Sequence, residues 1–176
     1  MKKFAIIYIF FLLGLFGCSE PDPVYLNNIV LEESFEKNNM PFFEQWQKNF
    51  ADSLLKFAED VPRDGGRYSI YLESIWGPPL SISREIDLNA GNYVLNLEVW
   101  SKTENVEGLI ELGVQKPDTF EVLDTILVKA AQWTSYKKSI SIELGISDKV
   151  KLVLSGGSSQ LLQGRTYYDK ITIKKE

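Results

Sequence analysis

Short segments in which apolar and polar residues alternate are the feature that most constrains the fold of this chain. In residues 92–101, NYVLNLEVWS, apolar side chains recur at every second position (Leu95, Leu97 and Val99), and residues 149–155, KVKLVLS, repeat the pattern. A period of two places successive side chains on opposite sides of an extended backbone, so each segment predicts a strand with one buried face. The pattern also occurs in residues 68–74, 109–115, 121–128, 133–144 and 166–174.

Turn-forming sequences separate these predicted strands. They are LNAGN at residues 88–92, QKPDT at 115–119 and SGGSS at 155–159. Several short strands at such close spacing predict an all-β fold, with the strands in an antiparallel β-sandwich or barrel. Residues 44–60 are the one stretch that could form a helix, but they carry no capping signal, and we expect a loop and a strand there.

The N-terminus predicts export and a lipid anchor. Lys2 and Lys3 precede an uncharged, mostly apolar run at residues 4–17, which is too short to span a bilayer and is typical of a secretory signal peptide. The run ends in LFGC, which resembles the lipobox of bacterial lipoproteins, and the resemblance implies that Cys18 becomes the lipidated first residue of the mature chain. The alternative is a buried thiol, or an unpaired cysteine in an ordinary secreted protein.

These observations predict three regions and a cellular location. We expect residues 1–17 to be a cleaved lipoprotein signal peptide, residues 18–27 to be the lipidated cysteine and a tether, and residues 28–176 to be the β-sandwich domain. Ser19 follows the cysteine in place of the Asp that resembles an inner-membrane retention signal, so an outer-membrane lipoprotein is favoured, facing either the periplasm or the exterior. The acidic residues of SEPDPV resemble a surface-export signal of the Bacteroidota, although the same letters also suit a solvated tether.

Composition excludes several classes of function. The chain has no histidine, which excludes a His-dependent catalytic triad and a His-ligated zinc site, and its single cysteine cannot form an internal disulfide. Removing Lys2 and Lys3 with the signal peptide takes the formal charge from −5 to −7. A surface this acidic repels phosphate backbones, so we do not expect a nucleic-acid partner.

The order of several longer segments resembles a known group of folds. These segments are VLEESFEKNNMPFFEQW, DVPRDGGRYSIYLES, SISREIDLNAGNYVLNLEVWSK, QWTSYKKSISI and YYDKITIK. Together they are similar to the galactose-binding-like jelly rolls that include many carbohydrate-binding modules, over roughly residues 28–175. The resemblance implies an antiparallel jelly-roll sandwich, but a fold shared by so many proteins does not define a function.

The resemblance also implies a structural calcium site. In these modules the opening strand, a Gly-rich turn and the last strand meet at one end of the sandwich. The matching ligands here are three carboxylates and two backbone carbonyls: Glu36, Asp64 and Asp169, with the carbonyls near Ser34 and Arg67. Calcium takes six to eight oxygen ligands of these kinds. In the alternative interpretation each acid is solvated or paired with Arg63, Arg67 or Lys170.

Candidates for glycan contact lie on the polar phase of the predicted strands. Sugar-binding proteins combine aromatic stacking with hydrogen bonds to hydroxyl groups, and the residues that fit are Tyr71, Glu73, Asn96, Glu98, Glu111 and Gln115. Trp76 lies in the Pro-stiffened loop SIWGPPLS, where its ring could stack on a sugar or pack under its own loop. The other tryptophans are expected to be structural, with Trp46 buried early in the fold and Trp100 and Trp133 covering the ends of the core.

Two functions remain after these exclusions. The first is a non-catalytic lipoprotein that binds glycan through its sandwich, and the second is a structural or accessory lipoprotein that holds another envelope protein through the same sandwich. An enzyme is not expected, because the mature chain is short and has no histidine to act as a general base. Exposed aromatic rings in a groove would favour the glycan, whereas a flat apolar patch would favour the protein partner.

Overall fold

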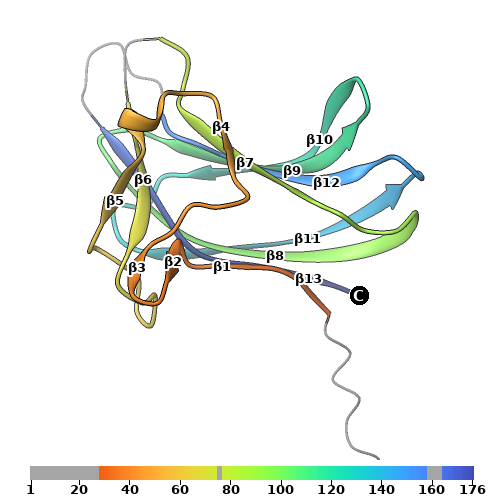
Figure 1. Ribbon diagram of the computed structural model, residues 1–176, viewed down its shortest axis with the longest axis horizontal. Coiled ribbons are helices and arrows are strands. Elements are labelled where there is room, and N and C mark those ends of the chain that lie inside the picture. Colours follow the sequence, from red (N-terminus) through yellow and green to blue (C-terminus); the bar gives the residue numbers. More distant parts are fainter. Residues whose placement is uncertain (1–27, 75–76, 158–163) are drawn as a thin grey trace, which may run out of the picture.

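The computed structural model describes residues 28–74, 77–157 and 164–176, which form two antiparallel sheets packed face to face (Figure 1). This confirms the predicted all-β antiparallel sandwich. Cys18 and Trp76 lie outside the described residues. No helix within the described part of the chain is long and apolar enough to cross a bilayer.

One sheet, called sheet I here, has the order β11-β8-β13-β6-β5, with β1 also paired to β13. Its strands are β1 (Ile29–Glu33), β5 (Lys56–Ala58), β6 (Ser69–Glu73), β8 (Gly91–Glu104), β11 (Thr134–Leu144) and β13 (Arg165–Lys175). The other, sheet II, has the order β10-β9-β12-β7-β4. Its strands are β4 (Gln47–Lys48), β7 (Ser81–Ile86), β9 (Gly108–Lys116), β10 (Thr119–Val128) and β12 (Lys149–Ser155). A small hairpin of β2 (Glu36–Lys37) and β3 (Met40–Pro41) lies apart from both.

All seven strands predicted from the alternating pattern are present, and β1, β4, β5 and β7 complete the sheets. The segment 44–60 contains β4, a short 3-10 helix (Asp52–Leu54) and β5, which confirms the expected loop and strand. In β7 the side chains of Ile82 and Ile86 point into the core, but Arg84 occupies the inward position between them. The apolar alternation of SISREI is therefore broken by a charged residue.

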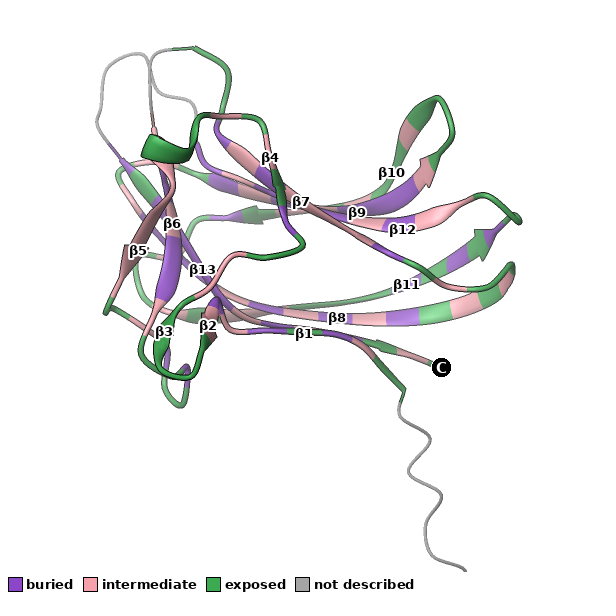
Figure 2. Ribbon diagram, viewed as in Figure 1, coloured by how far each residue is buried: buried purple, intermediate pink, exposed green. Residues whose placement is uncertain are grey.

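The core lies between the sheets and follows the alternation closely. Val150, Leu152 and Leu154 of β12 are each 0% exposed, while the residues between them are partly exposed, as the bands along the strands in Figure 2 show. Burying a side chain of this size stabilises the fold by about 1.5–3 kcal/mol. Trp46 is also buried, and its ring centroid lies 5.5 Å from that of Phe35, so its predicted structural role is confirmed.

Ion pairs between the sheets close the two open edges of the sandwich. On the side of β1 and β7, Arg84 Nη1 lies 3.0 Å from Glu33 Oε2. On the side of β10 and β11, Lys138 Nζ lies 3.0 Å from Asp124 Oδ2. Charged groups that point inward at an edge oppose the addition of further strands, because a new strand would have to desolvate them.

Two tryptophans do not cover the core as expected. Trp100 alternates with the buried Val99 and therefore lies on the outer face of sheet I, where it is half-buried. The indole nitrogen of Trp133 donates a hydrogen bond of 2.9 Å to Asp60, and its ring meets Tyr167 edge-on. Both expectations were wrong because these rings have partners outside the core: Asp60 for Trp133, and for Trp100 the Lys170 ammonium, which lies 5.6 Å from the ring centroid.

The first described residue lies next to the last strand. β1 pairs antiparallel with the C-terminal half of β13, and the Asn28 carbonyl accepts a hydrogen bond of 2.8 Å from the Lys175 amide. The start of β1 and the C-terminus therefore lie at the same end of the domain (Figure 1).

Candidate calcium and ligand sites

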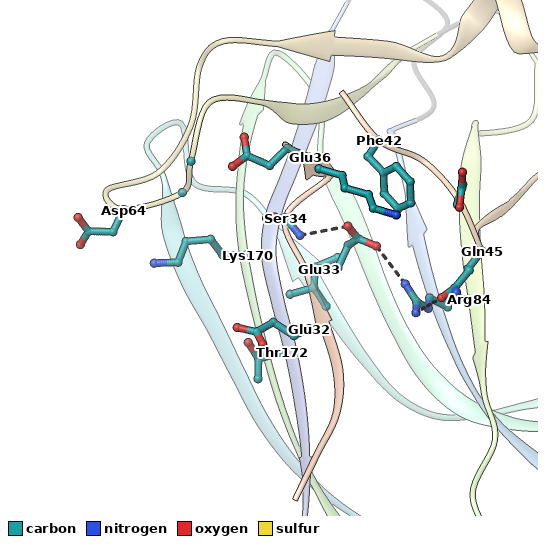
Figure 3. A pocket seen from close by; sticks show the side chains of 15 residues that line it. Glu32, Glu33, Ser34, Glu36, Phe42, Gln45, Asp64, Arg84, Lys170 and Thr172 are labelled. Atoms are coloured by element: carbon teal, nitrogen blue, oxygen red, sulfur yellow. Dashed lines mark hydrogen bonds and ion pairs between the residues drawn. The ribbon is translucent and has the colours of Figure 1, made fainter. Parts of the chain in front are cut away.

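A pocket of about 660 Å³ opens where the beginning of the chain meets the last strand (Figure 3). It lies between the end of β1, the Gly65–Gly66 turn and an irregularity in β13, where the register shifts between Asp169 and Thr172. The opening strand, the Gly-rich turn and the last strand thus meet at one place. Acidic side chains dominate the lining: Glu32, Glu33, Glu36, Glu44 and Asp64.

Glu33 holds the turn that leads into this pocket. One of its carboxylate oxygens accepts hydrogen bonds from the backbone amides of Ser34 (3.1 Å) and Phe35 (2.8 Å). The other accepts from Arg84 at 3.0 Å (Figure 3) and from the Trp46 indole at 2.9 Å. Four donors satisfy a carboxylate that is only 8% exposed, so Glu33 acts in structure rather than in ligand binding.

Glu36 is bound to the Gly-rich turn. Its Oε2 accepts hydrogen bonds from the backbone amides of Arg67 (2.7 Å) and Tyr68 (3.2 Å). Gly66 has a φ of +82°, and a Cβ at this position would lie 2.2 Å from Glu36 Oε1. Only glycine fits here without a shift, because any other side chain would collide with the carboxylate.

Asp169 is a buried acid with an unsatisfied oxygen. Its side chain is 0% exposed, Oδ1 accepts a hydrogen bond of 2.8 Å from the Lys170 amide, and Oδ2 has no hydrogen-bond partner among the residues that the structure describes. A Cβ on Gly65 would lie 2.6 Å from Oδ2, so the turn that contacts Glu36 also covers Asp169. Burial, together with the negative charge of Glu36, raises the pKa of Asp169 to about 8.

The other predicted calcium ligands are placed differently. The Asp64 side chain is 83% exposed and points away from the pocket (Figure 3), with its nearest cation, Arg63, at 3.8 Å. Ser34 lines the pocket, and Arg67 contributes its backbone amide to Glu36. Within the described residues no group of three or more acidic, histidine or cysteine side chains is arranged to hold a metal ion.

Two carboxylates of the predicted calcium set do face a common point. The unsatisfied Oδ2 of Asp169 lies against Gly65, and the carboxylate oxygens of Glu36 lie against the adjacent Gly66. Buried oxygen ligands of this kind suit calcium, which accepts carboxylates, backbone carbonyls and water together. Glu36 and Asp169 therefore fit the ion, with the remaining ligands drawn from backbone carbonyls and water.

The six candidates for glycan contact do not form one site. Tyr71, Glu73, Asn96 and Glu98 belong to β6 and β8 and lie on the outer face of sheet I, whereas Glu111 and Gln115 belong to β9 and lie on the outer face of sheet II. The structure therefore divides them between opposite sides of the sandwich.

Tyr71 and Glu73 are already engaged by other side chains of sheet I. The guanidinium of Arg165 lies 5.2 Å from the Tyr71 ring centroid and 3.5 Å from Glu73 Oε1. The Tyr71 ring also contacts Tyr167, with 5.3 Å between the centroids. This end of sheet I is thus an internally satisfied cluster of aromatic and charged groups.

Lys102 lies at the centre of the same cluster. Its ammonium pairs with Asp60 and lies 4.4 Å from the Tyr167 ring centroid. Burial disfavours the charge on Lys102, but the hydrogen bond and the attraction of Asp60 outweigh that effect and raise the pKa of Lys102 above its ordinary value. Lys102 and Asp60 therefore fix the segment that precedes the Gly65–Gly66 turn against sheet I.

The outer face of sheet II carries an aromatic residue that the sequence analysis missed. Phe120 is in register with Gln115 on the neighbouring strand, and its Cε2 lies 2.9 Å from where a Cβ on Gly113 would be. The Phe120 ring therefore lies over Gly113, which has no side chain to occupy that part of the sheet surface. The Lys151 ammonium lies 5.4 Å from the ring centroid and donates a hydrogen bond of 2.9 Å to Gln115 Oε1.

Glu111 belongs to the same face, two residues from Gly113 along β9. Val122 and Leu127 of β10 are 42% and 43% exposed, so apolar surface continues from the ring along the edge strand. A half-exposed ring with a carboxylate, an amide and an ammonium around it can stack on one face of a sugar and hydrogen-bond its hydroxyl groups. The predicted strand 121–128 excludes Phe120, whereas β10 begins at Thr119 and so includes it.

Comparison with known proteins identifies the fold. No protein-family model matches the chain, and no curated protein is significantly similar in sequence. Solved structures do match. One is a family 61 carbohydrate-binding module in complex with β-1,4-galactotriose, with a TM-score of 0.51, 16% identity, and coverage of 76% of this chain and 90% of that one.

Two further matches come from xylanase 10B of Clostridium thermocellum. Its C-terminal family 22 carbohydrate-binding module matches with a TM-score of 0.56 and 12% identity, over 85% of this chain and 95% of that one. A longer piece, a family 22 module joined to a family 10 catalytic module and complexed with xylohexaose, matches with a TM-score of 0.59 and 17% identity, over 86% of this chain and 29% of that one. The fold is that of a carbohydrate-binding module. At these identities the similarity establishes the β-sandwich fold. The ligand has to be inferred from the residues on the outer faces of the two sheets.

Proposed function

We propose that the chain is a non-catalytic glycan-binding module. The observation that carries this proposal is the outer face of sheet II, where the Phe120 ring lies over Gly113 with Gln115, Lys151 and Glu111 around it. Aromatic rings contribute much of the energy of binding sites because they bury a large area without many rotatable bonds. Similar folds were solved with a galacto-oligosaccharide and a xylo-oligosaccharide, which supports a neutral β-linked glycan as the ligand class.

The proposal is tested by substituting Phe120. Full-length protein would be titrated with β-1,4-galacto- and xylo-oligosaccharides in a calorimeter, and we expect Phe120→Ala to weaken binding at least tenfold, which corresponds to about 1.4 kcal/mol. Phe42→Ala is the matched control, because Phe42 is a half-buried aromatic in the acidic pocket. Equal affinities for wild type and Phe120→Ala, with both proteins folded, would refute this site.

The absence of catalysis is part of the proposal. The chain has no histidine to serve as a general base, and glycosidases that use a carboxylate pair place both groups beside the bond that is cleaved. The buried pair in this chain, Glu36 and Asp169, faces the Gly65–Gly66 turn. We expect no release of reducing sugar when the protein is incubated with the oligosaccharides it binds.

Calcium is proposed as a structural ion at Glu36 and Asp169. A divalent cation would satisfy the unpaired Oδ2 of Asp169 and offset the repulsion between the two carboxylates. Its role would be to fix the Gly65–Gly66 turn to β13, far from the outer face of sheet II. The ion would thus contribute to stability and not to contact with glycan.

The protein is proposed to be anchored in the outer membrane through lipid on Cys18. This rests on the apolar run at residues 4–17, the LFGC sequence and Ser19. Two or more acyl chains give stable anchoring, whereas one chain gives only marginal binding. Cys18→Ala should abolish incorporation of a palmitate analogue in growing cells while Ser19→Ala retains it, and label that persists in the Cys18 variant would contradict the anchor.

One observation favours a second candidate function, the holding of another envelope protein. Val122, Leu123 and Leu127 are all exposed on β10, the edge strand of sheet II. A patch of this kind suits a protein partner better than a sugar. Cross-linking in cells through a photoreactive residue at position 123 would support this function if it captured one envelope protein, and capture of none would remove it.

A further inference from the structure

The side-chain amide of Gln115, beside the Phe120 ring, is hydrogen-bonded within the protein. Its Nε2 donates to the backbone carbonyls of Lys116 at 2.8 Å and Thr119 at 3.2 Å, and its Oε1 accepts from the Lys151 ammonium at 2.9 Å. A side-chain amide has two N–H donors, which match the two carbonyls of the β9–β10 turn. These bonds to the turn fix the orientation of the amide, with its oxygen directed toward the lysine.

Lys151 has acidic neighbours with which it does not pair. It is in register with Glu85 on β7 and with Gly113 on β9. Glu111 lies two residues before Gly113 on β9 and Gln115 two residues after it, so a side chain as long as lysine can reach either one. Glu85 is paired with another lysine at 3.3 Å. The Lys151 ammonium is bonded to Gln115, which directs it away from Glu111.

The carboxylate of Glu111 is left available on the outer face of sheet II. It is partly exposed and forms no ion pair with any residue in the described ranges. Its neighbours in register, Thr125 on β10 and Val153 on β12, carry no charge. The face therefore presents a cationic donor and an anionic acceptor at separate places, with the aromatic ring beside the donor. An ion pair between the two groups would remove both of them from contact with a ligand.

We propose that Gln115 is the positioning residue of the glycan site: it holds the Lys151 ammonium beside the aromatic ring and away from Glu111. The inference rests on the proposed function and assigns roles within that site. A neutral sugar stacked on Phe120 accepts a hydrogen bond from the ammonium and donates one to the carboxylate. Gln115 itself does not touch the ligand, in contrast to the contact expected from the sequence. Without its amide, Lys151 is free to turn toward Glu111.

The test measures binding of β-1,4-galacto- and xylo-oligosaccharides to the full-length protein by calorimetry. Gln115→Met keeps the length of the side chain and removes its hydrogen bonds. We expect it to weaken binding about fivefold or more, the effect of losing one hydrogen bond, at an unchanged melting temperature. Gln132→Met is the matched control, because Gln132 is an exposed glutamine in the β10–β11 connection, and it should leave the affinity unchanged.

A second comparison separates a positioning role from a direct contact. Residues that act through one another give non-additive effects, whereas independent contacts add. In the Lys151→Met background, Gln115→Met should therefore weaken binding by less than about twofold, because no ammonium remains to be positioned. If Gln115→Met has its full effect in that background, the amide contacts the ligand or supports the fold in general, and the inference is overturned.

The remaining outcomes separate this inference from the proposed function. If Gln115→Met binds as tightly as wild type while Phe120→Ala is weakened, the positioning role is overturned and the proposed function stands. If wild type binds neither oligosaccharide, both are overturned. A loss in Gln115→Met that disappears in the Lys151→Met background supports the positioning role.

Discussion

The buried acid Asp169 makes a sharp prediction about stability and pH. In calcium-free protein the folded state favours its protonated form, since burial and Glu36 raise its pKa to about 8. In the unfolded chain the same group titrates near pH 4. The folded state is therefore fully stabilised below pH 4 and loses stability as the pH rises toward 8. Asp169→Asn removes the titrating group while keeping its size, so the variant should not lose stability over this range.

The size of the effect follows from the two pKa values. The unfolded state gains about 1.4 kcal/mol for each pH unit between them, or roughly 5 kcal/mol in total. A typical domain has only about 5–15 kcal/mol of stability, so calcium-free wild type should be close to unfolding at pH 8. Between about pH 6 and pH 8 the window is free of other side-chain titrations of ordinary pKa, because the chain has no histidine.

The assay is thermal unfolding between pH 5 and 8, with chelator and with calcium. With chelator, the wild-type melting temperature should fall steadily with pH, whereas that of Asp169→Asn should stay nearly constant. At 100 times its dissociation constant, calcium should add about 2.7 kcal/mol to wild type and little to the variant. The exposed turn acid Asp118 supplies the control, since Asp118→Asn should behave like wild type. A chelated wild type that melts at the same temperature from pH 5 to pH 8 would refute the argument.

Three further predictions concern other parts of the molecule. Gly66→Ala should destabilise the fold by more than 1 kcal/mol in urea unfolding, because its φ of +82° and the contact with Glu36 exclude a side chain, and an unchanged midpoint would contradict this packing. Arg84→Met should cost about 3–5 kcal/mol by leaving the Glu33 carboxylate buried without its cation, whereas Arg84→Met combined with Glu33→Gln should cost less than the first change alone. If the double variant is the less stable of the two, the loss in Arg84→Met does not come from an unpaired Glu33 carboxylate. Cys18→Ala should move the protein from the membrane to the soluble fraction of lysed cells, and retention in the membrane fraction would point to a different anchor.

The strands were the most predictable part of the fold. Alternation such as that of Val150, Leu152 and Leu154 is produced directly by burial of one face, so it can be read without a structure. β7 was hidden because Arg84 occupies an inward position, and only the partner Glu33 on the other sheet makes that placement favourable. The role of Glu33 could not be predicted either, since its donors come from three separate parts of the chain.

The candidate sites were predictable only in part. The resemblance indicated Glu36 and Asp169, which the structure brings to one glycine turn, but it also indicated Asp64, whose side chain points to solvent. For the glycan candidates, alternation gives the phase of a side chain on its strand but not the sheet to which the strand belongs. Asn96 and Glu111 both point outward from their strands, but the strands belong to different sheets, so the two side chains lie on opposite sides of the sandwich.

The pairing of β1 with β13 has a consequence for any protein fused to this one. Because Asn28 and Lys175 are hydrogen-bonded neighbours, a reporter attached after Glu176 would begin beside the segment that leads to Cys18. Nine residues separate Cys18 from Asn28, and such a stretch reaches at most about 30–35 Å when extended. In the lipid-anchored protein proposed above, a bulky C-terminal fusion would thus compete with the membrane for space. Inserting the reporter in the β10–β11 connection at Ala131–Gln132 would instead place it at the other end of the strands, because Thr134 pairs with Ser101 while Lys175 pairs with Leu95.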